Sequence, residues 1–96
     1  MLTHIKLSLR IYHNALDSDI QSNIETCMLD LRRVGVSETI AASNSEDSLI
    51  RKAAELYTKW QYDFNGKGEN FKKAYEDLRD AISLCNSYIA GGGADV

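Results

Sequence analysis

The strongest structural signal in the chain lies in residues 18–34, SDIQSNIETCMLDLRRV. Ser18 and Gln21 match the capping-box pattern, in which two side chains bond the free backbone amides at a helix start. Apolar residues then recur at helical spacing and fall on one stripe: Ile20, Ile24, Cys27, Met28 and Leu31. Gly35 follows as the expected left-handed terminator. The pattern predicts a helix over residues 18–34.

A second helix is predicted over residues 46–64, after the potential capping residues Asn44, Ser45 and Asp47. Its apolar residues cover an arc of about 160°, whereas a helix packed on one side needs only about 100°. This helix is therefore either central to the core or covered on a second side by a partner chain.

A third helix is predicted over residues 69–89, because a narrow apolar stripe lies opposite a charged face. The stripe consists of Phe71, Tyr75, Leu78, Ile82, Cys85 and Ile89. Three glycines at residues 91–93 end this pattern, and we expect residues 91–96 to form a flexible glycine-rich tail.

The N-terminal segment gives two conflicting signals. Ile5, Leu7, Leu9 and Ile11 alternate with polar residues, which predicts a strand. However, the sequence offers no second strand, and a lone strand leaves its backbone groups unpaired. Thr3 can instead cap a short helix. The residues alone leave helix and strand open.

The composition excludes several classes of protein. A chain of 96 residues with net charge -3, no proline and 44% apolar residues is typical of one globular domain, not of a disordered chain. No apolar run suits a membrane span and no signal peptide is visible, so we expect the chain to stay in the cytosol where it is made. The acidic balance argues against a free-standing DNA-binding domain, which usually carries a basic patch.

Residues capable of catalysis or metal binding do not converge in the sequence. His4 and His13 are nine residues apart, whereas two metal ligands on one helix prefer a spacing of three or four. Cys27 and Cys85 are expected to be two buried thiols rather than a disulfide. The turn at residues 66–68 lacks the spacing of a phosphate-binding loop. We therefore expect no catalytic residue, metal ion or cofactor.

Aromatic residues gather at the end of the second predicted helix and just after the following turn. The simpler interpretation is a core cluster that fastens a helical hairpin. The alternative is that Trp60 or Tyr62 projects into a subunit interface, where aromatic side chains and arginine are enriched.

Taken in order, these segments resemble the phage head–tail connector proteins of long-tailed bacteriophages. Residues 7–11 (LSLRI) and 17–20 (DSDI) are similar to the start of that family, where such a segment precedes an acidic dipeptide and a long helix. Residues 47–53 (DSLIRKA) and 71–78 (FKKAYEDL) are similar to later family segments. The resemblance covers the chain from about residue 2 to residue 89.

The resemblance implies an all-α fold: a small bundle of about four helices, in a single domain over residues 1–90, with a helical N-terminal segment. It implies no enzymatic activity and no membrane contact. Copies of the chain would form a ring, normally twelve-fold, beneath the portal protein in the virion neck, after assembly in the bacterial host cytoplasm. The ring would extend a channel through which DNA only passes, and would dock a stopper or tail-completion protein.

Candidate interface residues follow from this expected ring. Because each subunit of a ring uses two different surfaces, Arg32 and Arg33 are expected to meet acidic residues of a neighbour and fix the register. The full set expected at the subunit or portal interface is Arg32, Arg33, Arg51, Lys52, Trp60, Tyr62, Ile89 and Val96.

Two other classes of function are considered. A small helical regulator that binds a partner protein or DNA would form a dimer with a basic recognition helix, which the charge balance disfavours. A small enzyme would need a pocket with perturbed titratable groups, for which the sequence offers no set of residues.

Overall fold

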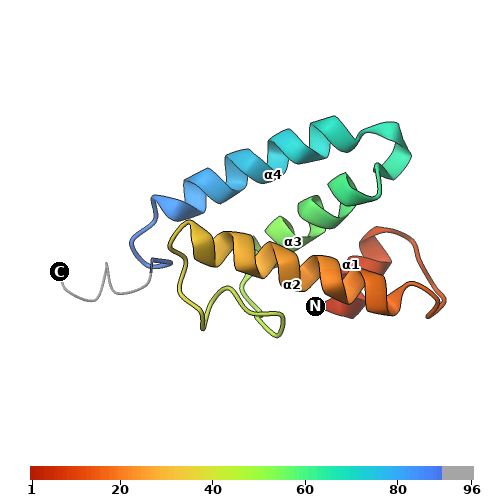
Figure 1. The fold of residues 1–96 in the computed structure, drawn as a ribbon, viewed down its shortest axis with the longest axis horizontal. Coiled ribbons are helices and arrows are strands. Elements are labelled where there is room, and N and C mark those ends of the chain that lie inside the picture. Colours follow the sequence, from red (N-terminus) through yellow and green to blue (C-terminus); the bar gives the residue numbers. More distant parts are fainter. Residues whose placement is uncertain (90–96) are drawn as a thin grey trace.

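The computed structural model describes residues 1–89, which form four α-helices and one short 3₁₀ turn (Figure 1). The elements are α1 (Leu2–Ser8), α2 (Asp17–Arg33), α3 (Ser48–Gln61), η1 (Phe64–Gly66) and α4 (Gly68–Ser83). Within residues 1–89 the β pairing is limited to one isolated bridge between Val36 and Ile89. The predicted all-α fold is confirmed, whereas Val96 and the predicted tail over residues 91–96 lie outside the described residues.

Helix α3 lies at the centre of the bundle, since it contacts α1, α2 and α4. Its buried residues are Ile50, Ala53, Ala54, Leu56 and Thr58. The Thr58 hydroxyl donates to the Ala54 carbonyl at 2.8 Å, so this buried polar group is satisfied. The wide apolar arc of this helix is therefore accounted for by the other helices of the same chain.

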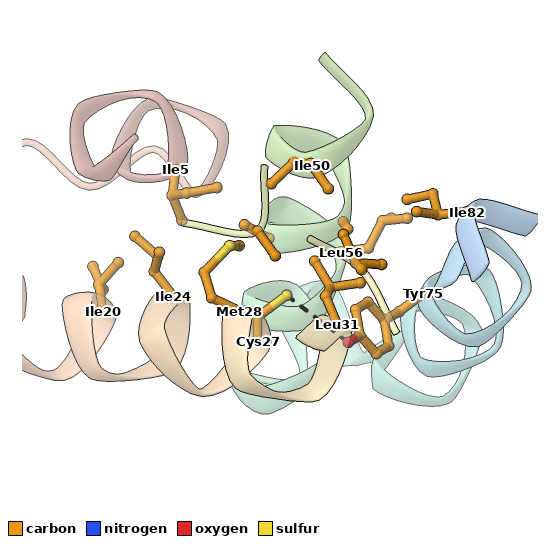
Figure 2. Packing of buried hydrophobic residues seen from close by; sticks show 14 of the residues in the cluster. Ile5, Ile20, Ile24, Cys27, Met28, Leu31, Ile50, Leu56, Tyr75 and Ile82 are labelled. Atoms are coloured by element: carbon orange, nitrogen blue, oxygen red, sulfur yellow. Dashed lines mark hydrogen bonds between the residues drawn. The ribbon is translucent and has the colours of Figure 1, made fainter. Parts of the chain in front are cut away.

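Helix α2 supplies the longest row of core side chains. The five residues of its predicted stripe, from Ile20 to Leu31, are all buried. Figure 2 shows them pointing from α2 toward Ile5 of α1 and Ile50 of α3, with Tyr75 and Ile82 of α4 at the other end of the core. Burying a large apolar side chain of this kind stabilises the fold by about 1.5–3 kcal/mol.

The N-terminal segment is helical, as the family resemblance implied. Ile5 and Leu9 lie one helical turn apart and are both buried, while Leu7 is exposed, so the alternating pattern did not indicate a strand. The helix pairs its own backbone groups and docks on α2 and α3. Thr3 does not cap it, because Met1 occupies the N-cap without a side-chain hydrogen bond.

The predicted starts of all three helices are corrected, that of α4 by one residue, since it begins at Gly68 rather than residue 69. The Ser18–Gln21 capping box is not formed, because α2 begins one residue earlier, at Asp17, with Leu16 at its N-cap. The second predicted helix begins at Ser48 rather than residue 46, because the Asp47 carboxylate accepts hydrogen bonds from the Leu49 and Ile50 amides at 2.9 and 3.2 Å.

The predicted helix ends are also corrected, that of α2 by one residue, since it ends at Arg33 with Val34 as its C-cap. Helix α3 ends at Gln61 rather than residue 64, because Asp63 adopts a left-handed conformation with φ 47° and its carboxylate accepts from the Gly68 amide at 2.7 Å. Helix α4 ends at Ser83 rather than residue 89. The residues after it include Asn86 and Ser87, which are weak helix formers, and tertiary hydrogen bonds compete for this segment.

The segment after α4 folds back against the linker between α2 and α3. The Ser37 amide donates to the Tyr88 carbonyl at 2.8 Å, and Ile89 bridges Val36 beside the left-handed Gly35, which has φ 103°. The Tyr88 hydroxyl donates to both Asp47 carboxylate oxygens, at 2.8 and 3.0 Å. One carboxylate therefore caps α3 and holds the C-terminal segment.

Because α4 ends at Ser83, Cys85 lies after the helix and its exposure differs from the prediction. Cys27 is buried as predicted, but Cys85 is exposed, so the prediction of two buried thiols is wrong for Cys85. Neither cysteine is in a disulfide.

Asp47→Ala is expected to lower the free energy of unfolding by about 1–2 kcal/mol, because it removes the N-cap of α3. Tyr88→Phe, which removes only the hydroxyl contact, is expected to cost about 0.5–1.5 kcal/mol. Urea denaturation followed by circular dichroism measures both. An Asp47→Ala variant as stable as the wild type would contradict this account of the helix start.

Candidate functional site

A surface groove of about 360 Å³ lies where α2, α3 and α4 meet. It is lined by Thr26, Leu29, Asp30, Arg33, Tyr57, Trp60 and Arg79. Leu29 is 61% exposed, which is high for a large apolar side chain on a regular helix. We call this the Leu29 groove; it combines an apolar and aromatic wall with two arginines.

The aromatic wall of the groove is also the predicted hairpin cluster. The Tyr57 ring packs edge-on against Trp60 at 5.5 Å and against Tyr75 at 5.2 Å between centroids. Lys72 lies over the Trp60 ring at 5.8 Å. Trp60 therefore fastens α3 to α4 and lines a surface groove, so the two interpretations of this side chain are compatible.

Asp30 organises the polar side of the groove. Its carboxylate accepts hydrogen bonds from the Tyr75 hydroxyl at 2.7 Å, from Arg33 Nη2 at 2.7 Å and from Arg79 Nη1 at 3.2 Å. Burial works against the ionised form, but the three donors outweigh it and hold the pKa of Asp30 below its usual 3.8. This carboxylate ties α2 to α4.

Asp30 and Arg79 were not predicted as site residues from the sequence. The available signal was the position of Asp30, three residues after Cys27 and directly before Leu31, which places it at the edge of the buried stripe. A carboxylate at such an edge needs a partner from another element. The sequence did not indicate that the partners would be Tyr75 and Arg79.

A second hollow, of about 310 Å³, lies between α1 and α3, and we call it the Arg51 pocket. It is lined by His4, Ser48, Arg51, Lys52 and Glu55. The Glu55 side chain is 12% exposed and lies 3.4 Å from His4 Nε2, 3.2 Å from Lys52 Nζ and 3.2 Å from Lys59 Nζ. Burial opposes ionisation of Glu55, yet the two lysines hold its pKa below 4.5.

Arg51 is the residue of this pocket with a nitrogen that has no hydrogen-bond acceptor. Its Nε atom is buried and has no hydrogen-bond partner within residues 1–89. The single carboxylate of the pocket, Glu55, is already shared by Lys52 and Lys59. The pocket therefore holds an excess of positive charge.

The other predicted interface residues have partners inside the chain. Arg32 Nε donates to the Ala41 carbonyl at 2.9 Å and so holds the α2–α3 linker, while Arg33 pairs with Asp30 on its own helix. Tyr62 donates to Asp19, which joins the end of α3 to the start of α2. The set thus divides into Arg33 with Trp60 in one groove and Arg51 with Lys52 in another pocket.

Ile89, also expected at the interface, is half-buried against the linker. Val96 lies beyond the part of the chain that the structure describes.

The chemistry of the described residues is that of binding surfaces. In residues 1–89 no group of three or more His, Cys, Asp or Glu side chains is placed to hold a metal ion. Burial raises the pKa of the Cys27 thiol to about 12, which keeps it protonated and unreactive at neutral pH. No helix in this part of the chain combines the length and apolar character that crossing a membrane requires.

Asp30→Asn is expected to lower the free energy of unfolding at neutral pH by about 1–3 kcal/mol, because the buried Tyr75 hydroxyl and the half-buried Arg79 lose a charged acceptor. Since folding lowers the pKa of Asp30, its stabilisation is present above the usual 3.8 and is lost as the pH falls through the folded-state pKa. Wild-type stability should therefore fall more steeply than that of Asp30→Asn between about pH 5 and pH 3. Urea titrations at each pH measure this, with the exposed Asp77→Asn as control; equal slopes would contradict it.

Comparison with known proteins agrees with the resemblance noted from the sequence. A family model described as "Phage connector protein" matches residues 1–88, a range that includes all four helices and both candidate surfaces. No curated protein and no solved structure matches the chain. The matched family is structural, which implies a non-enzymatic role. Because the match extends over nearly its whole length, the chain belongs to the phage connector protein family.

Proposed function

We propose that the protein is a structural component of the phage neck that forms a ring under the portal. The ring extends the DNA channel and docks the stopper or tail after genome packaging. The observation that carries this proposal is the family match over residues 1–88. The partners in this proposal are further copies of the chain, expected to be twelve, the portal protein, and a stopper or tail-completion protein.

The distribution of exposed apolar side chains supports a ring. Such side chains lie in separate places: Leu7, Tyr12 and Leu16 around the α1–α2 turn, Leu29 on α2, Leu49 on α3 and Leu84 after α4. A two-fold dimer uses one self-complementary patch, whereas a ring uses two different surfaces on each subunit. Several separated patches are more consistent with the second arrangement.

The charge of the chain supports a role in which DNA passes through without being held. The formal net charge is -3, and counterion release on binding DNA requires clustered basic residues. A channel wall with little net positive charge allows the duplex to slide. We infer that DNA is a passing cargo and not a bound ligand.

The direct test is assembly with the portal protein encoded in the same phage genome. Mixing the two and imaging the complexes by electron microscopy is expected to show an added ring below the portal. A persistent dimer that shifts a DNA duplex in a gel would instead support the regulator. A chain that binds neither the portal nor itself would contradict the proposed function.

Arg32→Glu with Arg33→Glu is expected to disrupt assembly while leaving the helical circular dichroism signal intact, because both arginines lie at the exposed end of α2. The matched variant Arg32→Gln with Arg33→Gln removes the same contacts to Ala41 and Asp30 without adding negative charge. The glutamate variant should assemble less well than the glutamine variant by sedimentation velocity. Unchanged rings in the glutamate variant would exclude these arginines from the interface.

A further inference from the structure

We propose that neighbouring copies of this chain meet through the outer face of α4 on one subunit and the Arg51 pocket on the next. The inference rests on the proposed function, since it identifies the surfaces that build the ring. The observation behind it is that acidic and basic side chains lie on two different faces of the bundle, although the net charge is only -3.

The outer face of α4 carries an acidic stripe. Four acidic residues and one lysine share this face of the helix: Glu69, Lys73, Glu76, Asp77 and Asp80. Lys73 pairs with Asp77 at 3.2 Å and Arg79 with Asp80 at 3.3 Å, yet the two aspartate side chains remain 67% and 68% exposed. The opposite side of the helix buries Tyr75 and Ile82 in the core. The stripe is therefore a negatively charged helix face free to accept further donors.

The Arg51 pocket is the complementary surface. It is concave and presents Arg51, Lys52 and His4 around the one carboxylate of Glu55. The buried Nε of Arg51 lacks an acceptor within residues 1–89. The Nε atom itself is enclosed by the chain, so a carboxylate that enters the pocket would pair with the rest of the Arg51 guanidinium, through a charge-assisted hydrogen bond roughly twice as strong as a neutral one.

Several features favour a second copy of the chain as the occupant. The acidic stripe lies on the outer face of α4 and the basic pocket between α1 and α3, so a molecule can offer its stripe to one neighbour and its pocket to another, which is the head-to-tail pairing of a ring. An exposed leucine lies at the end of each surface: Leu84, which is 84% exposed, follows Asp80, and Leu49 precedes Lys52. Apolar contact between such residues would add affinity, while the charges would set the register.

The test uses the full chain with reversed charges. Asp77→Lys with Asp80→Lys removes the acidic stripe, and Arg51→Glu with Lys52→Glu removes the basic pocket. Each variant is expected to self-associate at least roughly tenfold more weakly than the wild type by sedimentation velocity, and to form fewer rings on the portal. The variant with all four changes exchanges the two charges and is expected to regain association, as is an equimolar mixture of the two double variants.

Matched controls separate a specific contact from the change in net charge. Glu25→Lys with Glu38→Lys adds the same charge as the stripe variant at exposed positions of α2 and the linker. Arg10→Glu with Lys67→Glu matches the pocket variant at exposed positions in the same way. Both should associate like the wild type. If Arg51→Glu with Lys52→Glu fails to fold, Arg51→Gln with Lys52→Gln tests the same surface.

The possible outcomes distinguish this inference from the proposed function. If both charge-reversal variants form rings on the portal as well as the wild type does, the proposed interface is wrong but the proposed function stands. The same holds if the variant with all four changes does not regain association. Loss of binding to a DNA duplex in Arg51→Gln with Lys52→Gln, without any change in association, would overturn the interface in favour of a nucleic-acid site. A wild-type chain that assembles neither alone nor on the portal would overturn the function itself.

Discussion

Helix α3 packs against each of the other three helices, and this burial sets the position of every surface feature described above. Side chains such as Ile50 and Leu56 are buried in the core. The other side chains of α3 therefore lie at the surface, on different sides of the helix. Tyr57 and Trp60 emerge into the Leu29 groove, and Arg51 with Lys52 into the Arg51 pocket. The two surfaces are therefore held in a fixed relation by one rigid element.

A few carboxylates outside the apolar core connect segments that are distant in the sequence. Asp30 joins α2 to α4 through Tyr75 and Arg79, and Asp47 joins the start of α3 to Tyr88. Both carboxylates accept several donors, which specifies the docking of their partners. The core supplies most of the stability, and these two residues fix how α2 docks on α4 and how the C-terminal segment docks on α3.

Much of the fold could be predicted because α2 carries a complete apolar stripe and α3 an unusually wide one. The helical state of α1 could not be derived from its residues, since alternation at Ile5–Ile11 also fits a strand, and the family resemblance was needed. The end of α4 could not be predicted either, because the contacts of Tyr88 and Ile89 with the linker are tertiary.

The candidate site was predicted only in part, for a similar reason. Arg51, Lys52 and Trp60 were recognised as interface candidates, but their sequence positions did not indicate that they would fall into two separate hollows. Arg32 and Arg33 were expected to be free for a neighbour, whereas Ala41 and Asp30 already bind them. Partners supplied by other elements are visible only once the fold is known.

Copies of this chain are proposed to assemble head to tail into a connector ring. The most direct measurement is a cryo-electron microscopy map of the protein assembled on the portal, at a resolution that separates the helices. We expect α4 of each subunit to lie beside α1 and α3 of the next, with Asp77 and Asp80 at the Arg51 pocket. A ring in which the outer face of α4 contacts no neighbouring subunit would contradict it.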